Sequence, residues 1–565
     1  MFPTRTRVFV VLLAVMLVVP LAVGPAAGAG ATAVTDESPA TSPDGLQPAA
    51  SETAAPATPP IAAQTDDRPE NPTTSETIGY VDGYWYDDSL PVDDRDGAHV
   101  PEDELQAVVY RSMARVETIR ERTFETTPDV DVITREEFQN DTGALFGNIT
   151  ERDELLENVR YEALFMVDRE RDAVEAYKEL YGGSVAGYYE PSTDQIVLVS
   201  NDLESVEVNE NTLAHELVHA LQDQLFGLED FDRSTTNKDA AVNGLVEGDA
   251  SFVDQQYAER CQAEWTCLVP ETDQPDQDGI SWGQYFSMFM PYDEGPDFVE
   301  HVYDEGGWAA VDARYEDDIP ASASEIIHPG TDREPIDFDI EDRSTEKWSP
   351  LAINDTVSRL TMGEGTIVSM FADGTVTGEP SVLSSNEFLT YSGDIQYDQP
   401  ISDGWAGGEL VVYTTDAETV EESGFVWQTE WTDADDASEF RDGYLDLLSL
   451  HDAEPVDGVQ NTLRIEEAYP GSYAIEQDGS TVTIVRAPST AELSEIREGT
   501  APDGSHTIDH NIFGGEGSES SDGESESGDD SAAGGGDAGG DPIPGFGVLA
   551  AVIGTLLAVA VRHRR

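Results

Sequence analysis

A five-residue pattern near the middle of the chain places the strongest constraint on its fold. Residues 215–219 read His-Glu-Leu-Val-His within residues 209–226, a segment that begins with asparagine and is followed by Gly227. Asparagine is a favoured first cap of a helix, and glycine commonly follows its last turn. Side chains four residues apart lie on one helical face, so His215 and His219 can reach a single ion. We predict a helix with a metal site.

A catalytic zinc ion needs a third protein ligand and one position left open for water. The candidate, Glu247, lies in a second predicted helix over residues 239–260, directly before Gly248. The glycine would let this helix pass close to the first one. Acids are abundant in the chain, so composition alone gives Glu247 little preference over Asp249 or Asp254.

The spacing of the apolar residues changes just before the first predicted helix. Residues 184–200 contain two apolar runs, 185–189 and 195–199, which flank a segment with the composition of a turn. This pattern predicts a β-hairpin. Residues 101–122 have apolar positions at helical spacing, and residues 153–180 also read as helical, in more than one segment.

Two short segments resemble a known class of enzyme. Residues 215–224 read HELVHALQDQ and residues 245–250 read LVEGDA. This pair is similar to the gluzincin metallopeptidases, in which two histidines on one helix and a glutamate on the next bind Zn²⁺. The resemblance covers roughly residues 78–342 and implies an α+β metallopeptidase domain that acts on a protein or peptide substrate.

The resemblance also implies individual roles. It makes Glu247 the third zinc ligand beside His215 and His219. Glu216 is adjacent to the first ligand, where its carboxylate can take a proton from metal-bound water and return it to the leaving amine. In this class the strand pair before the active helix holds the substrate backbone, a role that the predicted hairpin would take.

Segments similar to residues 290–299 and 320–329 follow the zinc ligands in gluzincin-like proteins. On that basis Tyr292 and His328 are our candidates for stabilising the oxyanion, which needs a donor besides zinc. We expect residues 290–299 to lead into a helix. Acids that orient the imidazoles are also expected nearby, and the sequence does not choose among the three candidates, Asp223, Asp249 and Asp254.

The chain is extremely acidic. Its 565 residues include 115 Asp and Glu against 29 Lys and Arg, a net charge of −86. Nucleic acids and anionic lipids are therefore excluded as electrostatic partners. Hydrophobic residues make up 39% of the chain, enough for folded cores, so the charge indicates a halophilic protein and not a disordered one.

Screening explains how such a chain folds and gives a first testable prediction. At about 1 M salt the Debye length falls to about 3 Å, which removes most of the repulsion between surface carboxylates. We expect the folded body to melt at a lower temperature in about 0.1 M salt than in about 2 M salt. Thermal unfolding followed by circular dichroism measures this difference, and equal melting temperatures would contradict the screening argument.

The amino-terminal end has the features of an exported protein. Arg5 and Arg7 precede an apolar run over residues 8–23, and Ala-Gly-Ala at residues 27–29 fits a cleavage site, so residues 1–30 are predicted to be a signal peptide. Residues 31–77, rich in Ala, Thr, Pro and Ser, are predicted to be a disordered spacer.

The carboxy-terminal end carries a second signal. A spacer rich in Gly, Ser, Asp and Glu over residues 500–541 leads to residues 542–565, which hold Pro-Gly-Phe, a short apolar segment at 547–561 and a basic tail. This arrangement resembles the sorting signal of haloarchaeal surface proteins, which implies processing by an archaeal sortase and attachment of a lipid. The alternative is a retained transmembrane helix; both place the protein at the cell surface, anchored to the cytoplasmic membrane.

Export bears on two further features. Cys261 and Cys267 are predicted to form a disulfide, which would brace the loop after the Glu247 helix. Asn140, Asn148 and Asn354 each begin an Asn-x-Thr sequon and are candidate glycosylation sites.

A second unit is predicted after the metallopeptidase-like domain, which we place at residues 78–345. Residues 346–499 contain strand patterns at 410–415, 424–431 and 480–485 and a helical pattern at 433–450. These indicate a smaller α+β accessory domain, unless the segment is the final part of one continuous peptidase fold.

Three functions are compatible with these patterns. The first is a cell-surface zinc metallopeptidase. The second is a surface binding or adhesion protein that keeps a metal site without turnover, and the third is a zinc hydrolase of other bonds. Glu216 favours the first over the second, because a site without turnover has no need of a base, and the predicted hairpin favours it over the third.

Overall fold

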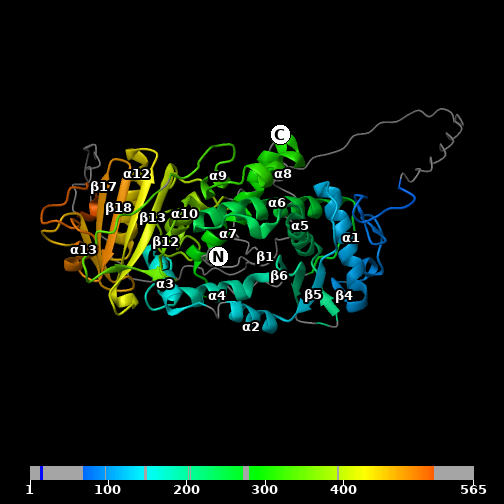
Figure 1. Cartoon of the computed structure of the whole chain (residues 1–565), viewed down its shortest axis with the longest axis horizontal. Coiled ribbons are helices and arrows are strands. Elements are labelled where there is room, and N and C mark those ends of the chain that lie inside the picture. The colour runs from blue at the N-terminus through cyan, green and yellow to red at the C-terminus, as the bar shows by residue number, and fades with distance from the viewer. Residues whose placement is uncertain are drawn as a thin grey trace, which may run out of the picture.

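The computed structural model describes residues 13–16, 68–95, 97–145, 149–200, 203, 205–270, 279–336, 338–390 and 394–513. Helices and strands are mixed throughout, which confirms the α+β class. A mainly helical portion and a β-rich portion lie at opposite ends of the long axis (Figure 1). The predicted site residues lie in the helical portion or at its junction with the other.

The helical portion is built from short strands and long helices. Its elements are β2 (Tyr80–Val81), β3 (Tyr84–Trp85), η1 (Pro91–Asp94), β4 (His99–Pro101), α1 (Glu102–Arg120), β5 (Asp129–Ile133), α2 (Arg135–Leu145), α3 (Glu151–Ala163), α4 (Ala173–Ser184), β6 (Val185–Glu190), β7 (Gln195–Val199), β8 (Ser205–Glu207), α5 (Glu210–Phe226), η3 (Leu228–Asp230), α6 (Thr236–Ala263), α7 (Trp282–Gly306), α8 (Trp308–Asp317) and α9 (Ala323–Ile327).

The predicted hairpin and the helix after it are confirmed. β6 and β7 pair antiparallel, with Tyr189 opposite Ile196. In α5 the side chain of Asn209 accepts a hydrogen bond from the N–H of Asn211, and Gly227 ends the helix in the left-handed conformation with φ 70°. Both caps are those expected from the sequence.

A small sheet lies beside α5. Its strand order is β1-β6-β7-β5, where β1 (Leu13–Met16) comes from the predicted signal peptide and β5 runs parallel to β7. β1 pairs antiparallel with β6 and places Val15 opposite Gly187. The strand nearest to α5 therefore accepts an extended segment along its outer edge.

Buried charges fix the start of α5. The Glu210 carboxylate accepts hydrogen bonds from Arg115 at 3.0 Å and Arg111 at 3.2 Å, both on α1, and from the N–H of Leu268 at 2.6 Å. The Glu210 and Arg111 side chains are 0% exposed and that of Arg115 is 2% exposed. An acid in the first turn also stabilises the helix dipole, so these contacts hold the amino end of α5 in place.

The crossing of α6 and α7 depends on glycine. A Cβ at Gly248 would lie 2.3 Å from the carbonyl oxygen of Gly295, and a Cβ at Gly295 would lie 2.5 Å from that of Gly244. Neither position admits a side chain without moving a helix backbone. The close approach predicted from Gly248 therefore occurs, although the helix that approaches is α7 and not α5.

Gly248→Ala is expected to destabilise the fold by about 1–3 kcal/mol, because the added methyl group must push α6 and α7 apart. Thermal unfolding in high salt measures the effect. Ser251→Ala, a change on the same helix at a half-buried position, is the control and should change stability little. A Gly248→Ala chain as stable as the wild type would contradict the packing described here.

The β-rich portion begins after α9. Its elements are β9 (Ser349–Pro350), β10 (Ala352–Ile353), β11 (Thr356–Val357), β12 (Arg359–Leu360), α10 (Glu364–Ala372), α11 (Ser385–Phe388), β13 (Trp405–Thr414), η4 (Val420–Glu422), β14 (Ser423–Trp431), α12 (Ala434–Leu450), β15 (Glu454–Pro455), β16 (Thr462–Ile465), β17 (Gly471–Asp478), β18 (Thr481–Ala487), α13 (Thr490–Ile496) and η5 (Asn511–Phe513).

Its main sheet is antiparallel, with the strand order β12-β13-β14-β18-β17-β16-β15 and β9 on β13. Successive residues of β13 alternate between two cores: Val411 joins the cluster that includes Leu493 and Ile496 of α13, and Val412 joins the large cluster that includes α12. This alternation is what the two faces of a strand require. The strands and the helix predicted for this region are confirmed.

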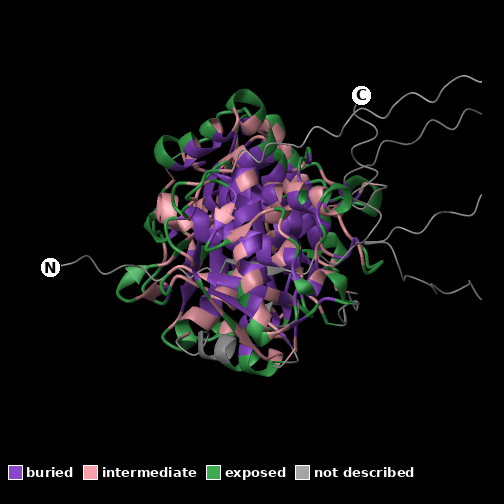
Figure 2. Ribbon diagram, turned by 90° about the vertical axis from the view of Figure 1, so that its right-hand side faces the viewer, coloured by how far each residue is buried: buried purple, intermediate pink, exposed green. Residues whose placement is uncertain are grey.

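The two portions share one core. The large hydrophobic cluster contains buried residues of both, and Figure 2 shows buried residues throughout the interior. Tyr444 of α12 donates a hydrogen bond to the carbonyl of Ala163, and Tyr469 donates one to that of Phe165, at 3.1 and 2.9 Å. The β-rich portion is thus packed against the rest of the fold.

The folded part of the chain extends further along the sequence than predicted, at both ends. Arg68, assigned to the first spacer, pairs with Asp87 at 2.5 Å, and the N–H of Thr507, assigned to the second, donates to Asn461 at 2.8 Å. Residues 31–67, 514–541 and 542–565, and residues 1–30 apart from β1, lie outside the described part of the chain. Among the helices that the structure describes, none is long and apolar enough to cross a membrane.

The sequons differ in what can be said of them. Asn140 and Asn354 are exposed, as a glycan would require, and Asn148 lies outside the described residues.

Candidate metal centre

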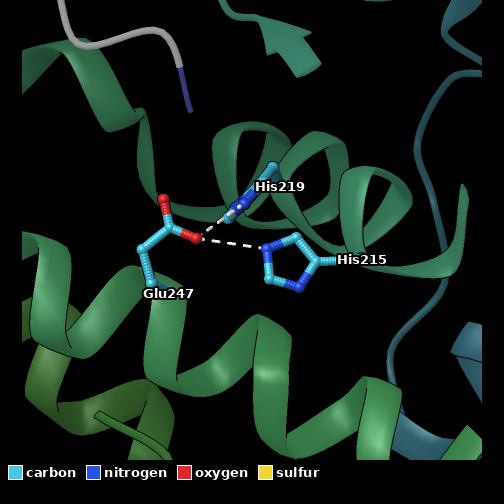
Figure 3. A group of neighbouring side chains, drawn as sticks. All are labelled: His215, His219 and Glu247. Carbon is cyan, nitrogen blue, oxygen red and sulfur yellow. Dashed lines mark hydrogen bonds and ion pairs between the residues drawn. The ribbon is translucent and has the colours of Figure 1, made fainter. Parts of the chain in front are cut away.

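Three predicted ligands converge between α5 and α6. One carboxylate oxygen of Glu247, Oε2, lies 3.1 Å from Nε2 of His215 and 3.3 Å from Nε2 of His219 (Figure 3). The three residues are no more than 2% exposed. The structure thus brings together two imidazole nitrogens and one carboxylate oxygen as a group that could hold a metal ion.

Local helical structure accounts for the relative positions of the two histidines. One turn of α5 separates the two histidines, whose rings lie 4.7 Å apart at 82° to each other. Glu247 comes from the middle of α6, which crosses α5 in the shared core. The sequence left Asp249 and Asp254 open as alternatives, and the structure places Glu247 at the centre.

Each imidazole is held in place by a hydrogen-bond partner of its Nδ1 atom. Nδ1 of His215 lies 3.2 Å from Oδ2 of Asp254, and Nδ1 of His219 lies 2.9 Å from Oε1 of Gln222. These partners accept hydrogen bonds at Nδ1, so both Nε2 atoms face Glu247, where they could bind a metal.

The group attracts positive charge strongly. Burial alone would lower the pKa of His215, but hydrogen bonds to Asp254 and Glu247 outweigh burial and raise it to about 10. Burial would likewise raise the pKa of Glu247, yet the two imidazoles outweigh it and lower that pKa to about 2. A cation between these side chains is therefore favoured, whether a proton or a metal ion.

The donor set fits a divalent metal. Nε2 of His219 is buried and makes no hydrogen bond within the described part of the chain. A buried nitrogen lone pair aimed at a carboxylate oxygen is unfavourable unless a positive charge lies between them. Two histidines and one glutamate are also a ligand set of catalytic zinc sites.

Glu216 follows His215 directly on α5. It is fully buried, and its Cγ is 3.7 Å from the place that a Cβ of Gly187 on β6 would occupy. The predicted base therefore lies between α5 and the strand whose outer edge carries β1. A Cβ at Gly187 would be in van der Waals contact with the Glu216 side chain and would approach Leu198 and the carbonyl oxygen of Val197 to 3.3 Å.

Tyr292 is close to the group, but in a different setting from the one predicted. Its ring lies 6.4 Å from the ring of His215, nearly parallel to it at 20°. Residues 290–299 do not lead into a helix; they are the interior of α7, which includes Pro291 and Pro296. Proline costs a helix one hydrogen bond, and here the packing of α7 on α6 offsets that cost.

His328 is held by the β-rich portion. Its Nε2 lies 2.7 Å from Oε1 of Glu364 on α10 and 3.9 Å from Oδ1 of Asp403. Burial lowers the pKa of His328, but the hydrogen bond to Glu364 outweighs it and raises that pKa. None of the contacts described for His328 is with His215, His219 or Glu247, so its oxyanion role stays a prediction.

His328, Glu364 and Asp403 have ligand atoms within 4.8 Å of one another, which makes them a second possible metal group. Nη1 of Arg333, however, lies 2.7 Å from Asp403 and 3.8 Å from Glu364. This guanidinium already supplies the positive charge that a metal would bring. We interpret the group as an ion-pair network that joins the two portions.

The predicted disulfide between Cys261 and Cys267 is present. It links the last turn of α6 to the loop that leads to Leu268, whose N–H donates to Glu210 at the start of α5. The bridge therefore braces the loop after the Glu247 helix, as expected, and connects it with the amino end of the histidine helix.

The three acids proposed to orient the imidazoles make different contacts in the structure. Asp254 contacts His215 directly, whereas Asp249 reaches His219 only through Gln222. Asp223 accepts a hydrogen bond from the hydroxyl of Tyr189 at 2.9 Å instead. Gln222 was missed by sequence reasoning; its position three residues after His219 is the signal that could have found it.

Comparison with known proteins adds one finding. Residues 352–497 match a family model described as a domain of unknown function, DUF8575. No curated protein and no solved structure matches the chain. The matched region covers most of the β-rich portion and includes Glu364 and Asp403, but none of the three ligands of the candidate metal centre.

Proposed function

We propose that this chain is a zinc-dependent metallopeptidase that acts at the cell surface. The observation that carries the proposal is the convergence of His215, His219 and Glu247 on one point, with the buried Glu216 beside them. Metal ligands with a neighbouring base are the two components that metal-assisted hydrolysis requires.

The sheet edge supports peptide bonds as the substrate class. β6 passes close to Glu216, and its outer edge, which pairs antiparallel with β1 in the full chain, would be free for another extended segment once the predicted signal peptide is removed. Main-chain hydrogen bonds to such an edge bind a peptide largely independently of its sequence. A substrate strand on β6 would lie next to the base.

The residues then have distinct tasks. Zn²⁺, when bound, would lower the pKa of a coordinated water towards neutrality and polarise the substrate carbonyl. Glu216 accepts the proton of the attacking water and passes it to the nitrogen of the leaving amine. Tyr292, beside His215, is the better placed of the two predicted oxyanion donors, because His328 is engaged with Glu364.

The location at the cell surface rests on the two ends of the chain. The predicted signal peptide exports the body, and the predicted sorting signal anchors it to the cytoplasmic membrane through a lipid or a retained helix. The acidic surface, which predicts function in high salt, is consistent with a body exposed to such a medium.

Metal analysis combined with a peptide-library digest in high salt tests the proposed function. We expect about one zinc ion per chain and cleavage of peptide bonds. A chain that binds zinc but cleaves no peptide would instead be a binding protein that has kept a metal site. A chain that binds no divalent metal would contradict the proposal altogether.

A further inference from the structure

Gln222 is not one of the three candidate metal ligands, but its side chain makes several hydrogen bonds next to them. It lies on α5 one turn after His219 and is 1% exposed. Its Oε1 is 2.9 Å from Nδ1 of His219. Its Nε2 donates to the carbonyl of Val246 at 2.9 Å and to Oδ2 of Asp249 at 3.1 Å.

These contacts allow only one orientation of the amide. The neighbours of Nε2 include the carbonyl of Val246 and the carboxylate of Asp249, which only accept hydrogen bonds. An amide turned by 180° would place its oxygen against both. Nε2 must therefore face them, so Oε1 must face His219, and an oxygen acceptor there requires a proton on Nδ1 of His219.

Asp249, which orients the amide, is itself fixed by a buried network. Arg120 of α1 donates to Asp249 at 3.0 Å and to Asp312 of α8 at 2.7 Å. The hydroxyl of Tyr315 lies 3.0 Å from both Asp249 and Gln222. These residues are at most 5% exposed, so the network is shielded from water and salt.

The helix α8 anchors the far end of this network. The Arg120 guanidinium lies 4.3 Å from the ring centroid of Trp308, whose Nε1 donates to the carbonyl of Ile119 at 2.7 Å. Burial raises the pKa of Tyr315 well above its usual value, which keeps its hydroxyl protonated as a donor to Asp249. Three helices besides α5 thus contribute to the position of one amide.

We propose that Gln222 is a positioning residue that sets the tautomer of His219, with its own amide oriented by Asp249 and Arg120. In the neutral ring, a proton on Nδ1 leaves the lone pair on Nε2, which faces Glu247. This inference rests on the metal centre of the proposed function and extends it to a ligand partner that does not touch metal or substrate.

Gln222→Leu removes both the oxygen and the nitrogen of the amide and leaves a side chain of similar volume. We expect it to weaken zinc binding by about 10–100-fold, the usual effect of losing an outer partner of a metal ligand. Competition with a chelator of known affinity measures the change in the full chain. Gln224→Leu, on the same helix but half-exposed and hydrogen-bonded to Glu125 and Thr126, is the matched control and should leave affinity unchanged.

A paired variant separates positioning from packing. Gln222→Glu sets a carboxylate against the oxygens of Val246 and Asp249, so it should also weaken zinc binding. Asp249→Asn in the same chain supplies an amide that can donate to the new carboxylate, and it should recover at least about tenfold of the affinity, about 1.4 kcal/mol. A purely packing role for Gln222 predicts no such recovery, and that result would overturn the proposal.

The tautomer can be read without any metal. In protein labelled with ¹⁵N-histidine, free of zinc and held at a pH at which the His219 ring is neutral, Nδ1 of His219 should carry the proton and Nε2 should not, and Gln222→Leu should lose this preference. A proton on Nε2 alone in the wild type would overturn the proposal. Because this measurement needs no metal or turnover, it stays decisive even if the peptidase assignment fails.

Discussion

Glutamine in place of Glu216 should reduce peptide hydrolysis by about 10²–10⁴-fold and leave zinc binding unchanged. The amide has the size of the carboxylate and fits the same buried place beside Gly187. It cannot, however, accept the proton of the attacking water. Because Glu216 is not one of the three converging ligands, its charge is not needed to hold the metal.

The measurement pairs turnover of a peptide identified in the library digest with zinc content per chain. Glu207→Gln, at an exposed position on β8, is the matched control and should hydrolyse peptide as the wild type does. If Glu216→Gln kept its turnover, the carboxylate would not be the base. If it lost zinc together with activity, Glu216 would belong to the ligand set.

Alanine in place of His219 should abolish zinc binding, the second large effect that we expect. The change removes one of three ligands and leaves Glu247 with a single imidazole at 3.1 Å. Zinc content should fall from about one ion per chain to near zero, and hydrolysis should fall with it. His99→Ala, at an exposed position on β4, is the control for loss of a histidine.

Stability provides an independent readout of the same change. At a free zinc concentration 100 times the dissociation constant, binding stabilises the native state by about 2.7 kcal/mol. The melting temperature of the wild type should therefore rise when zinc is added to metal-free protein, and that of His219→Ala should not. A similar rise in both proteins would place the zinc site elsewhere in the chain.

The elements predicted most closely are those set by neighbours in sequence. α5 starts after Asn209 and ends at Gly227, as its caps require, and β6 and β7 flank the predicted turn. The disulfide was also predicted, from a short separation of the two cysteines and the predicted export of the chain. Contacts between residues a few positions apart are enough to determine such features.

The prediction that residues 290–299 lead into a helix was wrong, because here packing between distant segments outweighs the local pattern. Pro291 and Pro296 indicate a break in local terms, because proline lacks the N–H of the helix ladder. In the fold, Gly295 lies against the backbone of α6, and this packing keeps the chain helical through both prolines. Nothing in residues 290–299 alone records which helix will pack against them.

By itself, the sequence determined the pair of histidines, the candidate base Glu216 between them and the helix that carries all three, since one helical turn fixes their spacing. Only the tertiary structure decided that Glu247 completes the group, that Asp254 and Gln222 support the imidazoles, and that His328 joins Glu364 instead. Those choices depend on how α6, α7 and α10 are rotated and packed. Such packing arises from contacts between segments far apart in the chain, which a local pattern does not encode.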